Sequence, residues 1–243
     1  MNYRLTLAYD GTNYHGWQVQ KNAVSVQSVF QEAVYTICND FPPVKGCSRT
    51  DTGVHANMYS VSFKTEKKLA PERLLKALNQ RLPKDIAVTS CELADDNFHA
   101  RYSAKSKRYV YKILNRPVRS PFLEGYALHY RYPLDEKLLH EASQAYIGRH
   151  DFAAFQSGNG GKTDTVRNVF SFEVRREGDM IYMTVEADGF LYNMVRIMAG
   201  TLLRIAEGKI PADGIPRIIE SGDRSNAGHT APAHGLYLDF VTY

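Results

Sequence analysis

The sequence predicts an α+β fold of two βαββαβ halves, each ferredoxin-like or RRM-like, with their sheets joined around a central basic cleft. Apolar residues alternate in some short segments and recur at helical spacing in others, and the same order of segments occurs twice. With 44% hydrophobic and 23% charged residues, the 243-residue chain falls outside the disordered, collagen-like and coiled-coil classes. The expected domains are residues 1–104 and 105–243.

The first half begins with residues 3–9, whose alternating Tyr and Leu side chains predict a half-buried strand. Residues 26–37 repeat apolar side chains at helical spacing, with Ser25 available as the N-cap. The elements expected after this helix are two strands at 44–48 and 58–63, a helix from Pro71 to Pro83, and a strand at 86–93.

The same order of elements returns after Arg101, although the two halves show no convincing residue-level identity. The second half is expected to contain strands at 108–114, 166–174, 180–187 and 236–241, with helices at 134–146 and 190–207. It carries additional material, which includes a loop at 156–164 and a short helix at 212–221. The sequence supports two interpretations of this loop about equally: a flap that contacts RNA, and a solvated connection.

Cysteine usage and hydropathy indicate the compartment. Cys38, Cys47 and Cys91 are an odd number, widely spaced, and form no C-x-x-C pair, which argues against a disulfide framework and favours a reducing environment. No stretch approaches ~18 uninterrupted apolar residues. We therefore expect a soluble, cytoplasmic protein without a membrane partner.

Positive charge is concentrated locally. The whole chain has 30 Lys and Arg against 26 Asp and Glu, but no acidic residue lies between Asp96 and Glu124. Seven cations occupy this interval: Arg101, Lys105, Lys107, Arg108, Lys112, Arg116 and Arg119. Tyr102, Tyr109, Tyr111 and Phe122 interleave with them, as is typical of surfaces that bind phosphates and stack unpaired bases. No helix-turn-helix or zinc-finger pattern accompanies them, so RNA is favoured over DNA, with a solvated face as the alternative.

The densest polar cluster is residues 45–56, where Asp51 occupies a Gly-containing loop between two predicted strands. Arg49 and His55 lie within four residues of it. Such a carboxylate can act as an anionic nucleophile while its neighbours bind a polyanion. The alternative is a structural Asp that hydrogen-bonds its own turn, which spacing alone favours.

Residues 49–56 (RTDTGVHA) resemble the signature of the tRNA pseudouridine synthase A family. Five further segments resemble the family in the same order: 7–18 (LAYDGTNYHGWQ), 106–111 (SKRYVY), 148–152 (GRHDF), 190–196 (FLYNMVR) and 231–238 (APAHGLYL). The similarity spans nearly the whole chain.

This resemblance implies an enzyme that isomerises uridines at positions 38, 39 and 40 of the tRNA anticodon arm, without cofactor or metal, after base flipping. It implies Asp51, Tyr109 and Arg196 as the catalytic residues, with Arg196 aiming Asp51, Tyr109 stacking on the base and Arg49 filling the vacated space. The remaining expected substrate contacts are Thr50, Gly53, His55, Lys107, Arg108 and Leu236. A family member is also expected to form a homodimer.

Several alternatives stay open. Tyr109 also suits a position in the core, and Arg196 also suits the surface of a helix. Leu236 resembles the residue that packs beneath the flipped base, and Leu238 lies on the same face of the strand. At the level of function, the alternatives are a non-catalytic tRNA-binding or tRNA-folding protein and a base-releasing glycosidase. Residues 156–163 lack the first Gly of a phosphate-binding loop, and no zinc-ligand spacing is present, so we expect neither nucleotide hydrolysis nor metal binding.

Overall fold

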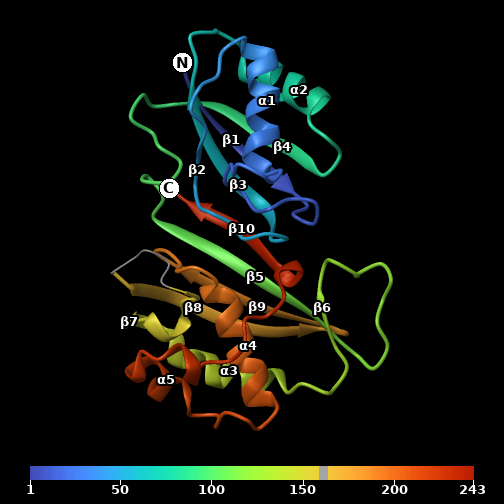
Figure 1. Cartoon of the computed structure of the whole chain (residues 1–243), viewed down its shortest axis with the longest axis vertical. Coiled ribbons are helices and arrows are strands. Elements are labelled where there is room, and N and C mark those ends of the chain that lie inside the picture. Colours follow the sequence, from blue (N-terminus) through green and yellow to red (C-terminus); the bar gives the residue numbers. More distant parts are fainter. Residues whose placement is uncertain (159–163) are drawn as a thin grey trace. The chain divides into compact units, whose positions relative to one another are not determined.

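The computed structural model describes residues 1–158 and 164–243, which form a mixed α+β protein as predicted. The chain divides into two compact units. The first unit comprises Met1–Lys105 and Tyr237–Tyr243, and the second comprises Ser106–Leu236 (Figure 1). No helix within the described residues is long and apolar enough to cross a membrane.

The sheet of the first unit is built around β1 (Asn2–Tyr9), which pairs antiparallel with both β3 (His55–Lys64) and β4 (Ile86–Ala94). The predicted alternation in β1 is confirmed, because Tyr3, Leu5, Leu7 and Tyr9 are all buried. Each such side chain contributes about 1.5–3 kcal/mol of burial free energy.

The outer edge of β3 is shared by two strands. β2 (Lys45–Gly46) runs antiparallel to β3, with Lys45 opposite Ser62. β10 (Leu236–Thr242) runs parallel to the start of β3, with Tyr237 opposite His55. The last strand of the chain therefore joins the first unit, whereas the sequence placed all of residues 105–243 in the second half. Pairing between strands nearly two hundred residues apart leaves no local sequence signal.

Two helices cover one face of this sheet. α1 (Val26–Cys38) begins at the predicted cap, where the backbone N–H groups of Ser28 and Ser25 each donate to the other residue's hydroxyl at 3.1 Å. α2 (Pro71–Arg81) begins at Pro71, as predicted. The helices lie next to each other in Figure 1, and α2 packs against β4.

The second unit has a sheet of order β5-β9-β8-β7, in which every pairing along this path is antiparallel. A short β6 pairs parallel with β5. The strands are β5 (Ser106–Asn115), β6 (Leu128–Tyr130), β7 (Gly148–Asp151), β8 (Val166–Glu177) and β9 (Met180–Ala187). The helices are α3 (Glu136–Ser143), α4 (Met194–Ala206) and α5 (Ile215–Ser221). α3 packs on β8 and α4, and α4 also contacts β5.

Several element boundaries differ from the predictions. β3 begins at His55 instead of residue 58, and β2 is limited to two residues. α3 begins at Glu136 because the Asp135 carboxylate accepts hydrogen bonds from the Lys137 and Leu138 N–H groups and so caps the helix there. α4 begins at Met194 because Asn193 has φ 61°, which ends any helical path from residue 190. α5 begins after Gly214, and the short strands β6 and β7 were not predicted.

A close backbone crossing fixes α4 against residues 228–231. A Cβ on Gly200 would lie 1.8 Å from the His229 carbonyl oxygen. The Gly228 N–H donates to Thr201 Oγ1 at 2.8 Å, and the Ala231 N–H donates to the Arg196 carbonyl at 3.1 Å. The crossing therefore fixes the backbone of the first turn of α4, where Arg196 lies.

We predict that Gly200→Ala destabilises the protein. Alanine is intrinsically better than glycine in a helix by about 1 kcal/mol, but the added methyl group meets a backbone carbonyl that only a shift of the crossing can relieve. Overpacking of this kind costs typically ~1–3 kcal/mol and here outweighs the helical gain. We expect a lower free energy of unfolding in a urea titration.

The matched control is Gly189→Ala, whose Cβ would lie 3.6 Å from the flexible Arg167 side chain. We expect this variant to stay within ~0.5 kcal/mol of the parent protein. A Gly200→Ala variant as stable as the parent would contradict the tight crossing.

Candidate active site

Asp51 lies in the turn that connects β2 to β3, and its side chain is partly exposed. The turn is tight, because the Val54 N–H donates to the Asp51 carbonyl at 3.1 Å and Gly53 adopts φ 77°. The prediction that Asp51 lies on a Gly-containing loop between two strands is therefore confirmed. Thr52 and, two residues before Asp51, Arg49 are exposed, whereas the adjacent Thr50 is buried.

The segment after β1 holds this turn from both sides of Asp51. The Trp17 N–H donates to the Thr50 carbonyl at 3.3 Å, and the Gly53 N–H donates to the Tyr14 carbonyl at 3.2 Å. Tyr14 is itself anchored, since its hydroxyl donates to Asp85 Oδ1 at 2.7 Å, and burial together with this carboxylate raises the pKa of the phenol. The aspartate is therefore presented by a backbone that other backbone groups fix.

Two glycines make this approach sterically feasible. A Cβ on Gly16, which has φ 76°, would lie 2.2 Å from the Thr50 carbonyl oxygen. A Cβ on Gly11 would lie 2.1 Å from the Val54 carbonyl oxygen. Any side chain at either position would push the two segments apart.

Thr50 and His55, predicted to contact substrate, are both buried beside the turn, with 8% and 1% exposure. Thr50 Oγ1 lies 2.9 Å from the Tyr9 hydroxyl. His55 Nδ1 lies 3.0 Å from the Gly11 backbone nitrogen and 3.1 Å from Asp10 Oδ1. Contacts within the first unit thus hold both side chains, and their role toward substrate stays a prediction.

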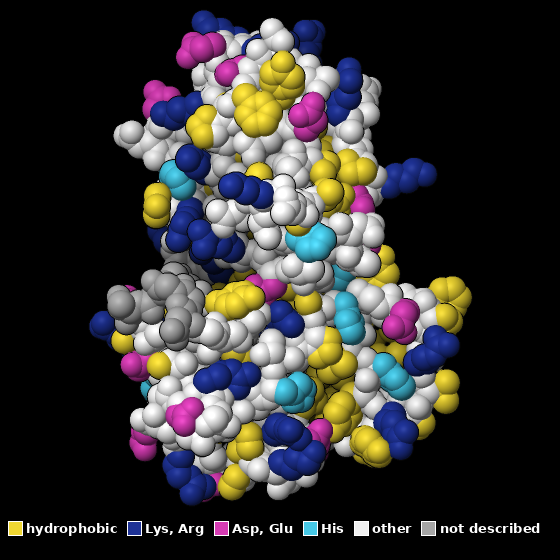
Figure 2. Space-filling view, in the orientation of Figure 1, with side chains coloured by type: hydrophobic (Ala, Val, Ile, Leu, Met, Phe, Trp, Pro, Cys, Tyr) yellow, Lys and Arg dark blue, Asp and Glu magenta, His cyan; other side chains and the backbone are white. Residues whose placement is uncertain are grey.

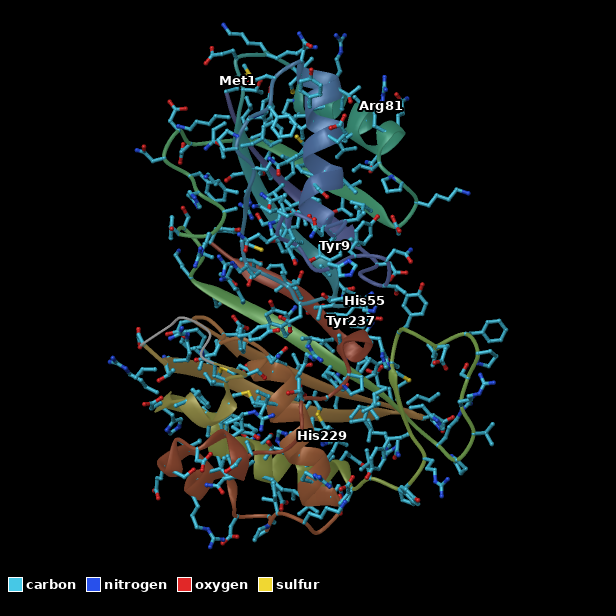
Figure 3. The ribbon with its side chains drawn as sticks, viewed as in Figure 1. Met1, Tyr9, His55, Arg81, His229 and Tyr237 are labelled. Carbon is cyan, nitrogen blue, oxygen red and sulfur yellow. The ribbon has the colours of Figure 1, made fainter. Side chains whose placement is uncertain are left out.

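Aromatic rings support the same region. The His55 ring stacks on Tyr237 with centroids 4.6 Å apart, and Figure 3 labels both residues together with Tyr9. Trp17 stacks on Tyr59 at 4.2 Å, and the Tyr59 hydroxyl donates to the Ser48 carbonyl. The sequence analysis assigned no role to Tyr9, Gly11, Gly16 or Trp17, although all four lie in the segment 7–18 that carries part of the family resemblance.

The predicted residues of the second unit lie on β5, α4 and the start of β10. Tyr109 on β5 is 5% exposed and packs edge-on against Phe190 with centroids 5.1 Å apart, while its neighbours Lys107 and Arg108 are half-buried. Leu236 is 5% exposed and Leu238 is fully buried, so burial does not choose between them.

Arg196, in the first turn of α4, has an oriented side chain. Its Nε donates to the Ala231 carbonyl at 2.7 Å, and its Nη1 donates to Asn193 Oδ1 at 2.8 Å. These two bonds restrict the rotation of the guanidinium plane. The side chain is half-buried, whereas the alternative interpretation of the sequence was an arginine on the surface of a helix.

The predicted site residues thus fall into two groups. The first unit brings together Arg49, Thr50, Asp51, Gly53 and His55. The second unit contains Lys107, Arg108, Tyr109, Arg196 and Leu236. The Asp51–Arg196 pair joins residues of different units and stays a prediction.

Other candidate chemistry finds little support. Burial raises the pKa of Cys38, and it raises the pKa of Cys91 to about 12 with help from Glu72 and Glu92, so neither thiol is ionised at neutral pH. Among residues 1–158 and 164–243, no three His, Cys, Asp or Glu side chains are grouped to hold a metal ion. Most of the predicted flap, residues 159–163, lies outside the described residues.

An aspartate on a turn fixed by backbone hydrogen bonds, close to an exposed arginine, suits the class of α+β enzymes that act through a carboxylate. Comparison with known proteins specifies the class further. The family described as tRNA pseudouridine synthase matches residues 6–103 and 142–243. The chain belongs to this family.

Relatives called tRNA pseudouridine synthase A match the chain along nearly its full length. The protein of Thermoanaerobacter sp. (strain X514) is 48% identical over 242 residues, covering 100% of this chain and 99% of the relative. That of Ruminiclostridium cellulolyticum is 46% identical over 241 residues, with 99% and 98% coverage. That of Acetivibrio thermocellus is 44% identical over 242 residues, with 100% and 99% coverage.

We predict that Gly16→Ala lowers catalytic efficiency while the protein stays folded. The methyl group would displace the Thr50 carbonyl and with it Asp51, and a misplacement of about 1 Å can cost roughly 100-fold in rate. The measurement is kcat/KM on substrate tRNA together with an unfolding titration.

Gly178→Ala is the control, because Gly178 also has a positive φ, 57°, but has open space around its Cβ position. This variant carries the same backbone strain without the collision. Equal kcat/KM values for the two variants would contradict the steric argument.

Proposed function

We propose that this protein isomerises uridine to pseudouridine in the anticodon arm of tRNA, with Asp51 as the catalytic carboxylate. The observation that carries the proposal is Asp51 itself, which occupies the RTDTGVHA segment on a turn fixed from both sides by backbone hydrogen bonds. Family membership supports the substrate class and the reaction.

The reaction breaks the bond between C1′ and N1, turns the uracil, and joins C5 to C1′. The uracil stays bound throughout, C5 loses its proton, and N1 gains one, so the product is an isomer of the substrate. A carboxylate can attack C1′ or assist departure of the base as a glycal forms. An aspartate of ordinary pKa ≈ 3.9 is already anionic at pH 7, so the protein's task is to position it.

The remaining predicted residues have roles around this centre. Arg196 aims the Asp51 carboxylate, and Tyr109 stacks on the target base and is available to accept a proton in the glycal route. Arg49 fills the space that the flipped nucleotide leaves, and Leu236 packs beneath the base. Lys107 and Arg108 bind phosphates. Thr50, Gly53 and His55 hold the Asp51 turn in addition to any substrate contact.

The architecture of the proposal is a pair of ferredoxin-like halves that contribute to one basic cleft. The strand order β4-β1-β3 with β2 beyond β3, and the order β5-β9-β8, both suit that arrangement. The resemblance to the family also supports a cytoplasmic homodimer.

The first test of this function is Asp51→Asn. The amide cannot act as an anionic nucleophile or base, so we expect pseudouridine formation to fall by about 10³-fold or more. Purified protein is incubated with uridine-labelled tRNA, pseudouridine is mapped by position, and free uracil is measured in parallel. Released uracil would indicate the glycosidase instead.

Asp40→Asn, a change at an exposed Asp of the same unit, is the matched control and should leave the rate unchanged. Binding of tRNA to Asp51→Asn should be retained or strengthened, since the change removes a negative charge from an RNA-binding surface. Full activity of Asp51→Asn would refute the role of Asp51. Binding of tRNA without any pseudouridine formation by the parent protein would instead favour a non-catalytic RNA-binding protein.

A second test concerns Arg196. Arg196→Ala should lose activity beyond any effect on folding, and Arg196→Lys should not restore it, because an ammonium cannot make the two-pronged contact to a carboxylate. Arg217→Ala, on the exposed surface of α5, is the control. Normal tRNA modification by Arg196→Ala, measured with the same mapping, would end the proposed pairing with Asp51.

A third test separates the two roles of Tyr109. Tyr109→Phe keeps the ring and its stacking on the base but removes the hydroxyl, so its rate reports proton transfer alone. We expect a fall in kcat of about 10²-fold or more if the hydroxyl accepts the proton, with little change in KM. Tyr182→Phe on β9 is the control, and an unchanged kcat for Tyr109→Phe would restrict Tyr109 to stacking.

A further inference from the structure

The connection between β4 and β5 forms a fixed crossing segment, residues 95–105, over the sheet face of the first unit that lies away from the helices. The Ala100 N–H donates to Ser62 Oγ at 3.0 Å. Ser62 is paired with Arg4, whose side chain points away from the buried face of β1 because neighbouring residues in a strand alternate. The crossing segment is therefore attached to the face of the sheet that lies away from α1 and α2.

Further anchors hold both ends of this segment. Asn2 Nδ2 donates to the carbonyls of Asp95 and Phe98 at 2.7 and 3.0 Å. The Tyr243 hydroxyl donates to the Ala100 carbonyl at 2.8 Å, and the Lys105 N–H donates to the Thr242 carbonyl at 2.8 Å. The outer side of the segment is thus a rigid surface.

That outer side carries an exposed pair of rings. Tyr102 is 78% exposed, and its ring lies 4.4 Å from the His99 ring, centroid to centroid, with planes tilted by 36°. The Arg101 guanidinium lies 5.6 Å from the Tyr102 ring centre. A tyrosine ring with most of its surface in water offers an accessible π face.

The partner ring, His99, is held in one orientation. Its Nδ1 accepts the backbone N–H groups of Arg101 and Tyr102 at 3.1 and 3.4 Å. The backbone N–H of His99 donates to Ser103 Oγ at 3.1 Å, and the backbone N–H of Ser103 donates to the His99 carbonyl at 2.9 Å. Burial, followed by the positive charge of Lys45, lowers the pKa of the His99 imidazole, with a smaller contribution from Arg101. The ring is thus neutral at pH 7 and lies in a positive field.

Exposed cationic side chains lie on the crossing segment and on β2. Lys45, Arg101 and Lys105 are all exposed. Figure 2 shows Lys and Arg side chains gathered with a histidine and a hydrophobic side chain on the flank of the first unit over this connection. Exposed aromatic rings among cations are typical of surfaces that stack unpaired bases and neutralise their phosphates.

We propose that Tyr102, backed by His99 and flanked by Arg101 and Lys45, is a stacking site for an unpaired nucleobase of the substrate RNA, separate from the Asp51 turn. The inference rests on the proposed function for its choice of RNA. It adds a contact that binds substrate without touching the reacting uridine.

An RNA strand fits this surface better than a protein partner does. Protein hot spots are usually Trp, Tyr or Arg side chains that lie in well-packed, desolvated pockets. The Phe98 ring of the crossing segment packs on Tyr243 at 4.9 Å, and both rings contact the Arg4 guanidinium. Tyr102 instead lies beside cationic side chains. A nucleobase can stack on its ring while the attached phosphate binds these cations.

The test measures equilibrium binding of unmodified tRNA to full-length protein carrying Asp51→Asn, at fixed ionic strength. Loss of base stacking weakens binding by about five-fold or more, so we expect this effect for Tyr102→Ala and for Tyr102→Leu, which keeps apolar bulk without a ring. Tyr102→Phe should bind within about two-fold of the parent. Arg101→Gln should reduce the slope of log K against log salt by about 0.7–0.9.

Tyr35→Ala is the matched control, because Tyr35 is an exposed tyrosine on α1 that also contacts another ring, Phe41, at 5.7 Å. It should bind like the parent, and unfolding titrations should show all variants folded. Unchanged affinity for Tyr102→Ala, equal affinities for Tyr102→Leu and Tyr102→Phe, or an equal loss for Tyr35→Ala would each overturn the stacking site. The binding measurement is independent of pseudouridine formation, so the failure of either proposal can be recognised without the other.

Discussion

The close contact between the segment after β1 and the turn that carries Asp51 is the constraint on which the proposed chemistry depends. Carboxylate catalysis at a sugar carbon requires accurate placement of the reacting oxygen. Side-chain hydrogen bonds alone would leave the turn adjustable. Backbone hydrogen bonds to Thr50 and from Gly53 fix it on both sides of Asp51. Gly11 and Gly16 serve this contact by bringing the two backbones close.

The second unit uses the same physical device at Arg196. Gly200 and Gly228 let residues 228–231 cross α4 at backbone distance. The crossing in turn supplies the Ala231 carbonyl that accepts from Arg196 Nε. An arginine has many rotamers, and their restriction before substrate binds reduces the entropy lost when it makes a two-pronged contact. In both units, glycines let two backbone segments approach closely, and this contact fixes the backbone that carries Asp51 or that anchors Arg196.

The sequence predicted the elements whose signals are local. Alternation gave β1, helical spacing and caps gave α1 and α2, and the Gly-containing turn placed Asp51 between β2 and β3. What it missed depends on an unusual backbone conformation or on contacts between distant residues. Asn193 starts α4 later than periodicity suggests because its backbone adopts a positive φ, and β10 joins the first unit by pairing with β3. The supporting roles of Gly11 and Gly16 became visible only when their distances to residues 50–54 were known.

Charge counting was informative about the substrate class and less so about which residues serve it. Residues 101–119 include seven Lys and Arg side chains, but Arg101 and Lys105 belong to the first unit and the other five belong to the second. Arg116 is partly neutralised, since its Nη1 lies 3.3 Å from Asp179 and its Nε donates to the Val118 carbonyl.

Arg101 and Lys105, in contrast, extend from a segment whose backbone is tied to the sheet, beside an exposed tyrosine. A cation contributes to RNA binding when no carboxylate neutralises its charge and when its position is fixed relative to a surface on which a base can stack. The two residues at the start of the interval meet the second condition through their backbone anchors. The proposed chemistry at Asp51 requires RNA contacts beyond this turn, because a carboxylate repels the phosphates that accompany its own substrate.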